Sequence, residues 1–374
     1  MADYLFLAVV ALFLLVFIIQ LYFITVIQGR LRGHKPAELS ALDTVQLPVS
    51  VVICARNEEK NLEKNLPFIL SQAYPSFEVV VVNDCSSDDS DLVLRGLAVE
   101  YPHLKVVNIN EHARYKHGKK FAVTLGIKAA SNEHLIFTDA DCRPASENWI
   151  ALIQRNYIAG KEIVLGYSPY LKYRGFLNAF IRFETFQTAL NYLSFCLNGN
   201  PYMGVGRNLS YTKSLFFRNK GFASHMHILS GDDDLFVNQN ATARNTAIEI
   251  HPDSHVLSEP KRSLASYWKQ KLRHMGAGKA YKRIHKLTLT IQAASAIFFY
   301  LLIPFLILLD VQWWLITGVY LIRLLIQLLV YYPVFRKLRN KDLFWWFPAL
   351  DLFYNFFIIV LSIISSFKKK VQWK

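Results

Sequence analysis

The residues best suited to chemistry are two carboxylates one residue apart, in the segment Asp139-Ala140-Asp141. Alternate side chains of an extended segment point the same way, so both carboxylates can reach one cation. Carboxylate oxygens are the ligands that Mg²⁺ and Mn²⁺ prefer, and such a cation can bridge the oxygens of a phosphate group. The sequence therefore predicts a site for Mg²⁺ or Mn²⁺ at Asp139 and Asp141.

The triplet directly follows a short hydrophobic run, Leu135 to Thr138, and two similar runs precede it, Val49 to Cys54 and Phe77 to Val82. Helical patterns at about 58–72, 88–100 and 119–131 alternate with these runs. Alternation of strands and helices predicts an α/β fold with a mostly parallel sheet and helices on both faces.

Polar residues follow all three predicted strands. The first strand runs into Ala55-Arg56-Asn57-Glu58, the second into Asn83-Asp84 and the third into the acidic triplet. Each group alone could be a turn or a helix cap. Because ligands bind at the carboxyl ends of parallel strands, three such groups in succession predict a shared site.

Hydrophobic residues make up 53% of the 374 residues and concentrate at the two ends of the chain. Tyr4 to Gln28 is uncharged and exceeds the roughly 20 apolar residues that cross a bilayer. A cleaved signal peptide is the alternative, but the segment lacks a basic start and a cleavage site. Basic residues after the segment predict that its C-terminal end lies in the cytoplasm.

Three further apolar segments follow the middle of the chain, at Leu287 to Leu309, Val311 to Phe335 and Leu343 to Phe367. Arg323 interrupts the second, and we expect it to face another helix or a lipid headgroup, since an isolated charge among acyl chains is costly. Asp351 and the Trp345-Trp346 pair make the last segment the weakest candidate. We therefore expect two late spans plus an interfacial or partly inserted segment; the Lys368–Lys370 tail would lie outside if all three span.

The formal net charge is +14, and basic residues cluster beside the apolar segments, which favours an anionic membrane surface or a diphosphate ligand over nucleic acid. The four cysteines show no zinc-binding spacing and are expected to be reduced thiols. The predicted organisation is a transmembrane helix at 1–29, a linker at 30–47, a cytoplasmic catalytic domain at 48–285 and a membrane region of two or three helices at 286–374.

Several short motifs, in this order and spacing, resemble the family 2 glycosyltransferases of the GT-A fold, of the membrane-anchored bacterial type. The resemblance covers about Pro48 to Ala280. It rests on Ala55-Arg56-Asn57-Glu58, Asn83-Asp84 with Ser86, Ser87 and Asp88, Gly118-Lys119-x-x-Ala122, Asp139-x-Asp141, Gly231-Asp232-Asp233-Asp234-Leu235 and Gln270-x-x-Arg273.

The resemblance implies roles for these residues. The nucleotide pocket would be formed by Ala55, Arg56, Asn57, Glu58, Asp84, Lys119 and Asp139, with Asp84 on the base. Asp139 and Asp141 would hold the metal and the diphosphate, Asp232 would be the catalytic base, and Gln270 and Arg273 would pack over nucleotide and acceptor.

Two positions depart from the family pattern. Gly231 replaces the usual acidic residue before the base, which leaves Asp233 as an alternative base, and His274 replaces the usual tryptophan after Arg273. The tryptophan often stacks on an acceptor sugar, so this departure weakens the case for a long-polymer synthase.

Two segments bear on the acceptor. Gly175 to Leu197 predicts an aromatic-rich helix, with core packing as the first interpretation and a surface against the bilayer as the alternative. In the resembled family, the segment Met203 to Asn208 shapes the acceptor pocket. Ser263 to Lys286 is basic and aromatic and precedes a membrane segment, as an interface helix does.

The leading hypothesis is an inverting, metal-dependent transfer of a sugar from a nucleotide-sugar, UDP-linked by default from the resemblance. The acceptor would be a lipid, lipid-linked or glycan molecule at the cytoplasmic face of a bacterial inner membrane. A processive polysaccharide synthase and a non-catalytic nucleotide-sugar-binding membrane protein are the alternatives.

Overall fold

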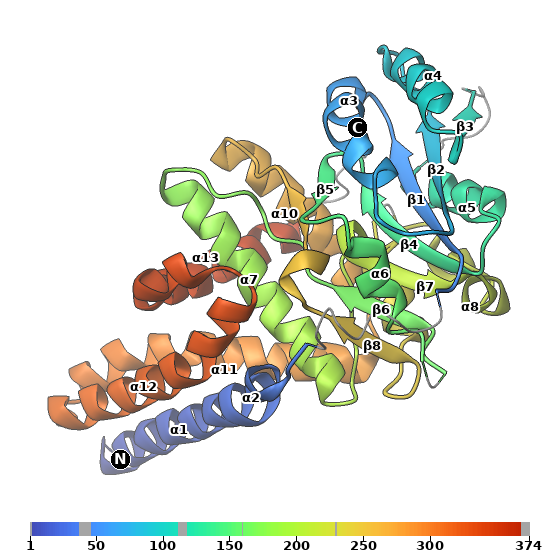
Figure 1. Cartoon of the computed structure of the whole chain (residues 1–374). Helices are drawn as coiled ribbons and strands as arrows, with labels where there is room; N and C mark the ends of the chain where they lie inside the picture. Colours follow the sequence, from blue (N-terminus) through green and yellow to red (C-terminus); the bar gives the residue numbers. More distant parts are fainter. Residues whose placement is uncertain (1, 37–45, 111–117, 159, 229, 368–374) are drawn as a thin grey trace.

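The computed structural model describes residues 2–36, 46–110, 118–158, 160–228 and 230–367. A sheet domain occupies one end of the molecule, and long apolar helices extend from the other (Figure 1). The Lys368–Lys370 tail lies outside the described residues.

The main sheet has seven strands in the order β3-β2-β1-β4-β7-β6-β8. β1 is parallel to β2 and β4, and β2 is parallel to β3, while β7 is antiparallel to both of its neighbours. The mostly parallel sheet is thus confirmed. The strands are β1 Val49–Ala55, β2 Phe77–Asp84, β3 Leu104–Ile109, β4 His134–Asp139, β6 Ile163–Gly166, β7 Leu209–Thr212 and β8 Thr246–Glu249.

Helices cover both faces of this sheet because the central strands are apolar on both sides. On one face, Val51 and Ile53 of β1 share a core with Leu62 and Leu66 of α3. On the other face, Val52 packs into a second core. The helices around the parallel strands are α3 Glu59–Leu70, α4 Ser90–Glu100, α5 Lys119–Ala129 and α6 Trp149–Gln154.

Close approach of α5 to the sheet requires Gly126. A Cβ at this position would lie 2.6 Å from Cγ1 of Val52 and 3.0 Å from a methyl carbon of Val82. A larger residue would push α5 away from the strands, and Lys119 at the start of α5 would move with it.

A second, two-stranded sheet pairs β5 Cys142–Pro144 with β9 Val256–Ser258. It begins directly after Asp141, and Tyr170 joins its edge through a bridge to Ser258. This small sheet fixes the chain that leaves the acidic triplet.

The helix α7, Phe176–Leu197, lies between the sheet domain and the apolar helices (Figure 1). Phe180, Phe183 and Phe186 are buried, and the ring of Phe186 stacks on Phe335 with centroids 3.9 Å apart. Phe176 at the start of the helix is 60% exposed. Core packing, the first interpretation of this segment, therefore holds for most of its aromatic face.

Four helical segments among the described residues are long and apolar enough to cross a membrane. The first is continuous from α1 Ala2–Tyr22 through a π-helical segment, Phe23–Gln28, to α2 Gly29–Gly33. The others are α11 Arg283–Leu308, α12 Trp313–Lys337, and a 3₁₀ turn Lys341–Trp346 that leads into α13 Phe347–Phe367.

The last helix also contacts the sheet domain. The ring of Phe357 in α13 meets Phe180 of α7 and both Tyr267 and Trp268 of α10, which spans Leu264–Gly278. Figure 1 shows α13 beside α7, whereas α1, α11 and α12 extend away together. The expectation of an interfacial or partly inserted last segment stays a prediction.

Arg323 faces other helices, as expected from the sequence. Its guanidinium donates to Oε1 of Gln20 at 3.1 Å and to the hydroxyl of Tyr300 at 3.2 Å, and it pairs with Asp351 at 3.4 Å. These residues come from α12, α1, α11 and α13, so one buried cluster ties all four apolar segments together. Asp351, which weakened the last segment as a membrane span, is the partner that neutralises Arg323.

Candidate active site

The loops after β1 and β2 are held together by hydrogen bonds. Asn57 adopts a left-handed conformation, with φ of 54°, which asparagine tolerates better than most residues. Its Oδ1 accepts from the backbone N–H of Ser87 at 2.7 Å, and its own N–H donates to Oγ of Ser86 at 3.0 Å. Asn57 therefore fixes the shape of this rim, next to Ala55 and Arg56 at the end of β1.

Asp84, at the end of β2, is buried with one oxygen lacking a donor. Its side chain is 4% exposed, and Oδ1 has no hydrogen-bond partner among the described residues. Oδ1 of the neighbouring Asn83 also has no partner among these described residues. Buried polar atoms are rarely left unpaired, so the free oxygen of Asp84 can accept an N–H group from a ligand.

The acidic triplet offers two carboxylates to a cation. Ligand atoms of Asp139, Asp141 and Cys142 all lie within 4.8 Å of one another. Burial raises the pKa of Cys142 well above its usual value, and a thiol is a softer ligand than the two carboxylates. The donor set is therefore two carboxylates, which suits Mg²⁺ or Mn²⁺.

These carboxylates repel each other. Burial raises the pKa of Asp141, and the charge of Asp139 acts in the same direction. Burial also raises the pKa of Glu58, with contributions from Asp141 and Asp139. A divalent cation would relieve this repulsion, so the residues present fit such an ion.

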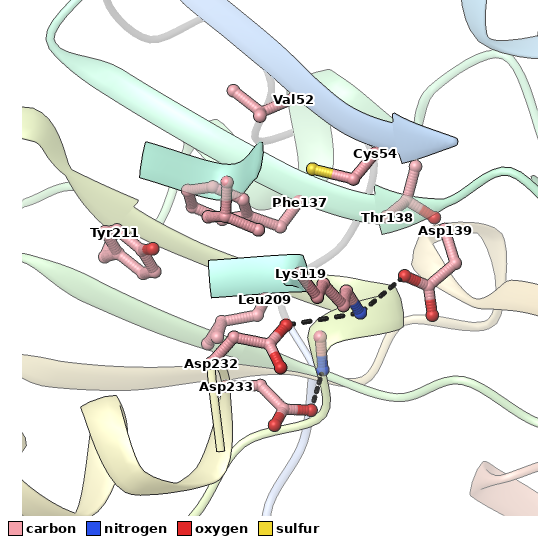
Figure 2. A pocket seen from close by; sticks show the side chains of 12 residues that line it. Val52, Cys54, Lys119, Phe137, Thr138, Asp139, Leu209, Tyr211, Asp232 and Asp233 are labelled. Atoms are coloured by element: carbon pink, nitrogen blue, oxygen red, sulfur yellow. Dashed lines mark hydrogen bonds and ion pairs between the residues drawn. The ribbon is translucent and has the colours of Figure 1, made fainter. Parts of the chain in front are cut away.

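Lys119 joins the acidic triplet to the predicted base. Its ammonium group contacts Oδ1 of Asp139 at 2.9 Å and Oδ2 of Asp232 at 3.2 Å. Figure 2 shows Lys119 between the two carboxylates, in a small pocket that also includes Asp233 and Gly206. Burial alone would lower the pKa of Lys119, but the three aspartates raise it well above the usual value. Lys119 therefore stays protonated and positively charged.

Asp232 and Asp233 have different partners. Oδ2 of Asp233 accepts from the backbone N–H of Gly206 at 2.7 Å, and Oδ1 caps α9, Asp234–Asn240, through the N–H of Asp234. Both oxygens of Asp233 thus accept backbone N–H groups, whereas Asp232 points toward Lys119 (Figure 2). This geometry favours Asp232 over Asp233 as a proton acceptor.

The backbone conformation explains why a glycine precedes Asp232. Gly231 has a φ of 92°, and a Cβ there would lie 2.5 Å from Cδ1 of Leu235. An acidic residue, as in the family pattern, would not fit this turn without rearrangement.

The start of α9 is also tied to the turn before α11. The hydroxyl of Tyr281 donates to Oδ2 of Asp234 at 2.8 Å, and the N–H of Lys282 donates to Oδ1 of Asn238 at 2.8 Å. The position of Asp232 is thereby linked to an apolar helix.

The helix α10 brings Gln270 and Arg273 to the same region. Gln270 donates to the hydroxyl of Tyr170 at 3.3 Å, and the charge of Arg273 is among those that lower the pKa of Asp139, after Lys119 and Arg207. An ion pair between Lys271 and buried Glu184 anchors α10 to α7. His274, in place of the tryptophan, is exposed.

The structure adds two residues that the sequence motifs do not single out, Arg207 and Tyr170. The guanidinium of Arg207 lies over the ring of Tyr170, 4.4 Å from its centroid. Arg207 falls within the Met203 to Asn208 segment, so its place near the pocket was predictable, but no motif assigns it a role.

Residues 50–214 match the family model described as glycosyl transferase family 2. The glycosyltransferase AglE of Haloferax volcanii is 34% identical over 110 residues, which is 29% of this chain and 34% of the relative. The beta-monoglucosyldiacylglycerol synthase of Trichormus variabilis is 30% identical over 120 residues, 31% of this chain and 25% of the relative. The chain thus spans about a third or less of the length of these relatives.

A solved structure shares the fold over most of the chain. The mannosyltransferase PcManGT from Pyrobaculum calidifontis, in complex with GDP-Man and Mn²⁺, superposes with a TM-score of 0.58 at 18% sequence identity. The match covers 91% of this chain and 99% of that one. With the motifs, the sheet and the family match taken together, this chain carries a family 2 glycosyltransferase domain of the GT-A fold.

Proposed function

We propose that the chain is an inverting, metal-dependent glycosyltransferase that moves a sugar from a nucleotide-sugar to a lipid, lipid-linked or glycan acceptor. The observation that carries the proposal is the placement of Asp139 and Asp232 on opposite sides of one ammonium group, that of Lys119. A cation-binding carboxylate and a proton acceptor thereby share one pocket.

The donor side is supported by the strand ends. Asp139 and Asp141 would hold Mg²⁺ or Mn²⁺, and the bound cation would neutralise charge on the diphosphate as it leaves. The Asp84 oxygen that lacks a partner among the described residues suits an N–H group of a base. PcManGT, whose structure contains GDP-Man and Mn²⁺, supports both a nucleotide-sugar donor and a divalent cation. UDP remains the default nucleotide from the motif resemblance.

The transfer step needs a proton acceptor near the sugar. The acceptor oxygen attacks the anomeric carbon and gives its proton to Asp232, while the bond to the diphosphate breaks and the nucleotide takes the electron pair. A single displacement of this kind inverts the anomeric configuration. Lys119 and Arg273 supply fixed positive charge next to the departing phosphate, and Gln270 helps to shape the acceptor side.

Membrane placement follows from the apolar helices and their flanking charges. Arg30 and Arg32 lie in the last turns of the first apolar segment, which supports a cytoplasmic position for the catalytic domain. The diacylglycerol named in the Trichormus relative supports a lipid acceptor. The active site and α11 are linked through Tyr281, so the pocket would lie near headgroup depth.

A donor screen on the detergent-purified full chain tests the proposal. UDP- and GDP-linked sugars are added with Mn²⁺ and a membrane lipid extract, and released nucleoside diphosphate is measured. We expect release from at least one donor, dependent on both the cation and the extract. No turnover of any donor under these conditions would contradict the proposal.

A further inference from the structure

The small sheet brings a tyrosine against the chain that follows the acidic triplet. β5 begins directly after Asp141 and pairs with β9, and the backbone N–H of Leu171 donates to the carbonyl of Ser258 in β9 at 3.0 Å. The bridge between Tyr170 and Ser258 continues this pairing. Tyr170 is therefore held by backbone contacts and not only by its own side chain.

Arg207 lies flat against this tyrosine. Its guanidinium carbon is 4.4 Å from the ring centroid of Tyr170, and the Tyr170 hydroxyl is itself held by Gln270 at 3.3 Å. Stacking fixes the plane of a guanidinium group but leaves the N–H groups at its edge available. The Tyr170 ring thus orients the Arg207 side chain and leaves its N–H groups free to donate.

One of those donors is buried and unused. Nη1 of Arg207 has no hydrogen-bond partner within the part of the chain that the structure describes, and Oε1 of Gln270 has none there either. A buried donor without an acceptor is costly, typically by about 1–3 kcal/mol. A ligand that enters this region can supply the missing acceptor.

The surrounding charges show what kind of ligand this is. Arg207 lies near the acidic triplet, because the Tyr170 ring on which it stacks is bridged to Ser258, and Ser258 pairs with Cys142, the residue directly after Asp141. Yet no carboxylate oxygen of the described residues lies within 4.0 Å of the Arg207 guanidinium nitrogens, the distance of an ion pair. The Arg207 guanidinium thus lies near the candidate metal-binding carboxylates without forming an ion pair with them among the described residues.

We propose that Arg207, held on Tyr170, binds an anionic oxygen of a phosphate or carboxylate group beside the Asp139–Asp141 pair. The inference rests on the proposed function, because the ligand would be the donor diphosphate or an acidic group of the acceptor. An arginine offers two parallel N–H groups to such an anion, with a strength and direction that lysine lacks. Arg207 would thus determine specificity for an anionic ligand.

The test compares Arg207→Gln, Arg207→Lys and a control, Arg244→Gln, which changes an exposed arginine. Binding of inorganic pyrophosphate, UDP and GDP is measured by calorimetry on the full chain in detergent with Mn²⁺. We expect Arg207→Gln to weaken pyrophosphate binding about tenfold or more, Arg207→Lys to recover part of the loss, and the control to match the unchanged protein. Equal thermal unfolding midpoints exclude a folding defect as the cause.

A second set of probes identifies the source of the anion. If the acceptor supplies it, Arg207→Gln leaves pyrophosphate and nucleotide binding unchanged but weakens binding of decyl phosphate or decanoate in the presence of saturating nucleotide. Unchanged binding of every probe in Arg207→Gln would overturn the proposal. If the unchanged protein binds pyrophosphate through Arg207 but neither UDP nor GDP, the nucleotide-sugar function fails while the anion site stands.

Discussion

Asp139 and Asp232 contact the same ammonium group, that of Lys119, although they lie far apart in the sequence. Asp139 ends the strand β4, and Asp232 lies two residues before the helix α9. Lys119, at the start of α5, thus joins the proposed cation-binding carboxylate to the proposed base.

Replacing Lys119 would increase the repulsion among the three neighbouring aspartates. Lys119→Met would leave Asp139, Asp232 and Asp233 without their common counter-charge, so we expect a lower thermal unfolding midpoint in the metal-free protein. Addition of Mn²⁺ should restore more of the loss in the variant than it adds to the unchanged protein, since the cation replaces part of the missing charge. Differential scanning fluorimetry with EDTA and with Mn²⁺ measures both.

Lys120→Met is a useful comparison for that experiment. Lys120 donates to the carbonyls of His225 and Ile228 rather than to the aspartates. Its replacement should destabilise the protein without a larger response to Mn²⁺. An equal response of the two variants would show that Lys119 has no special relation to the cation site.

Asp234 predicts a pH dependence of stability. Burial, with the charge of Asp233, raises its pKa from 3.8 to about 8. In the unfolded chain the group loses its proton near pH 4, while the folded chain keeps it until about pH 8, so the stabilisation is complete below pH 4 and is lost as the pH rises toward 8. We expect the unfolding midpoint to fall from pH 5 to pH 8 more steeply in the unchanged protein than in Asp234→Asn.

Tyr281→Phe tests the contact between α9 and the turn before α11. It removes the hydroxyl that donates to Asp234 and leaves the ring in place. We expect faster hydrogen exchange in α9 and a lower rate of transfer at unchanged donor affinity, because Asp232 is positioned by the same helix. Unaltered exchange in α9 would mean that this contact does not hold the helix.

The buried pair in the apolar region gives a stability prediction. Arg323→Met alone would leave Asp351 buried without its partner, at a cost of about 3–5 kcal/mol. The double variant Arg323→Met, Asp351→Leu removes both charges and should recover much of that loss. Thermal unfolding of detergent-purified protein compares the two; equal destabilisation would mean that the pair is not coupled.

The sequence predicts the parallel half of the sheet well because the strands β1, β2 and β4 are apolar runs that end in polar residues. It misses β3, which also belongs to the parallel half. It does not predict β6, β7 and β8 either, since four-residue strands such as Ile163–Gly166 leave too little pattern to recognise. It assigns Asp232 as the base and leaves Asp233 as the alternative. In the structure, the backbone N–H of Gly206 donates to Asp233, a contact between residues distant in the chain that favours Asp232 as the proton acceptor.

The same limit applies to Asp351. In the sequence, Asp351 weakens the last apolar segment as a membrane span, because the sequence shows the charge but not its partner in another helix. In the structure it pairs with Arg323 of the preceding helix. Contacts between separate elements determine both the roles of Asp232 and Asp233 and the environment of Asp351. Local sequence spacing does not reveal such contacts.

The most direct test of the proposed chemistry compares Asp232→Asn with Asp141→Asn in two assays, calorimetric binding of nucleotide with Mn²⁺ and single-turnover sugar transfer. We predict that Asp232→Asn binds nucleotide and Mn²⁺ normally but transfers sugar about 10²–10⁴ times more slowly, as expected when a general base is lost. Asp141→Asn should lose both binding and transfer. Normal transfer by Asp232→Asn, or an equal loss of binding in the two variants, would contradict the assignment of Asp232 as the base.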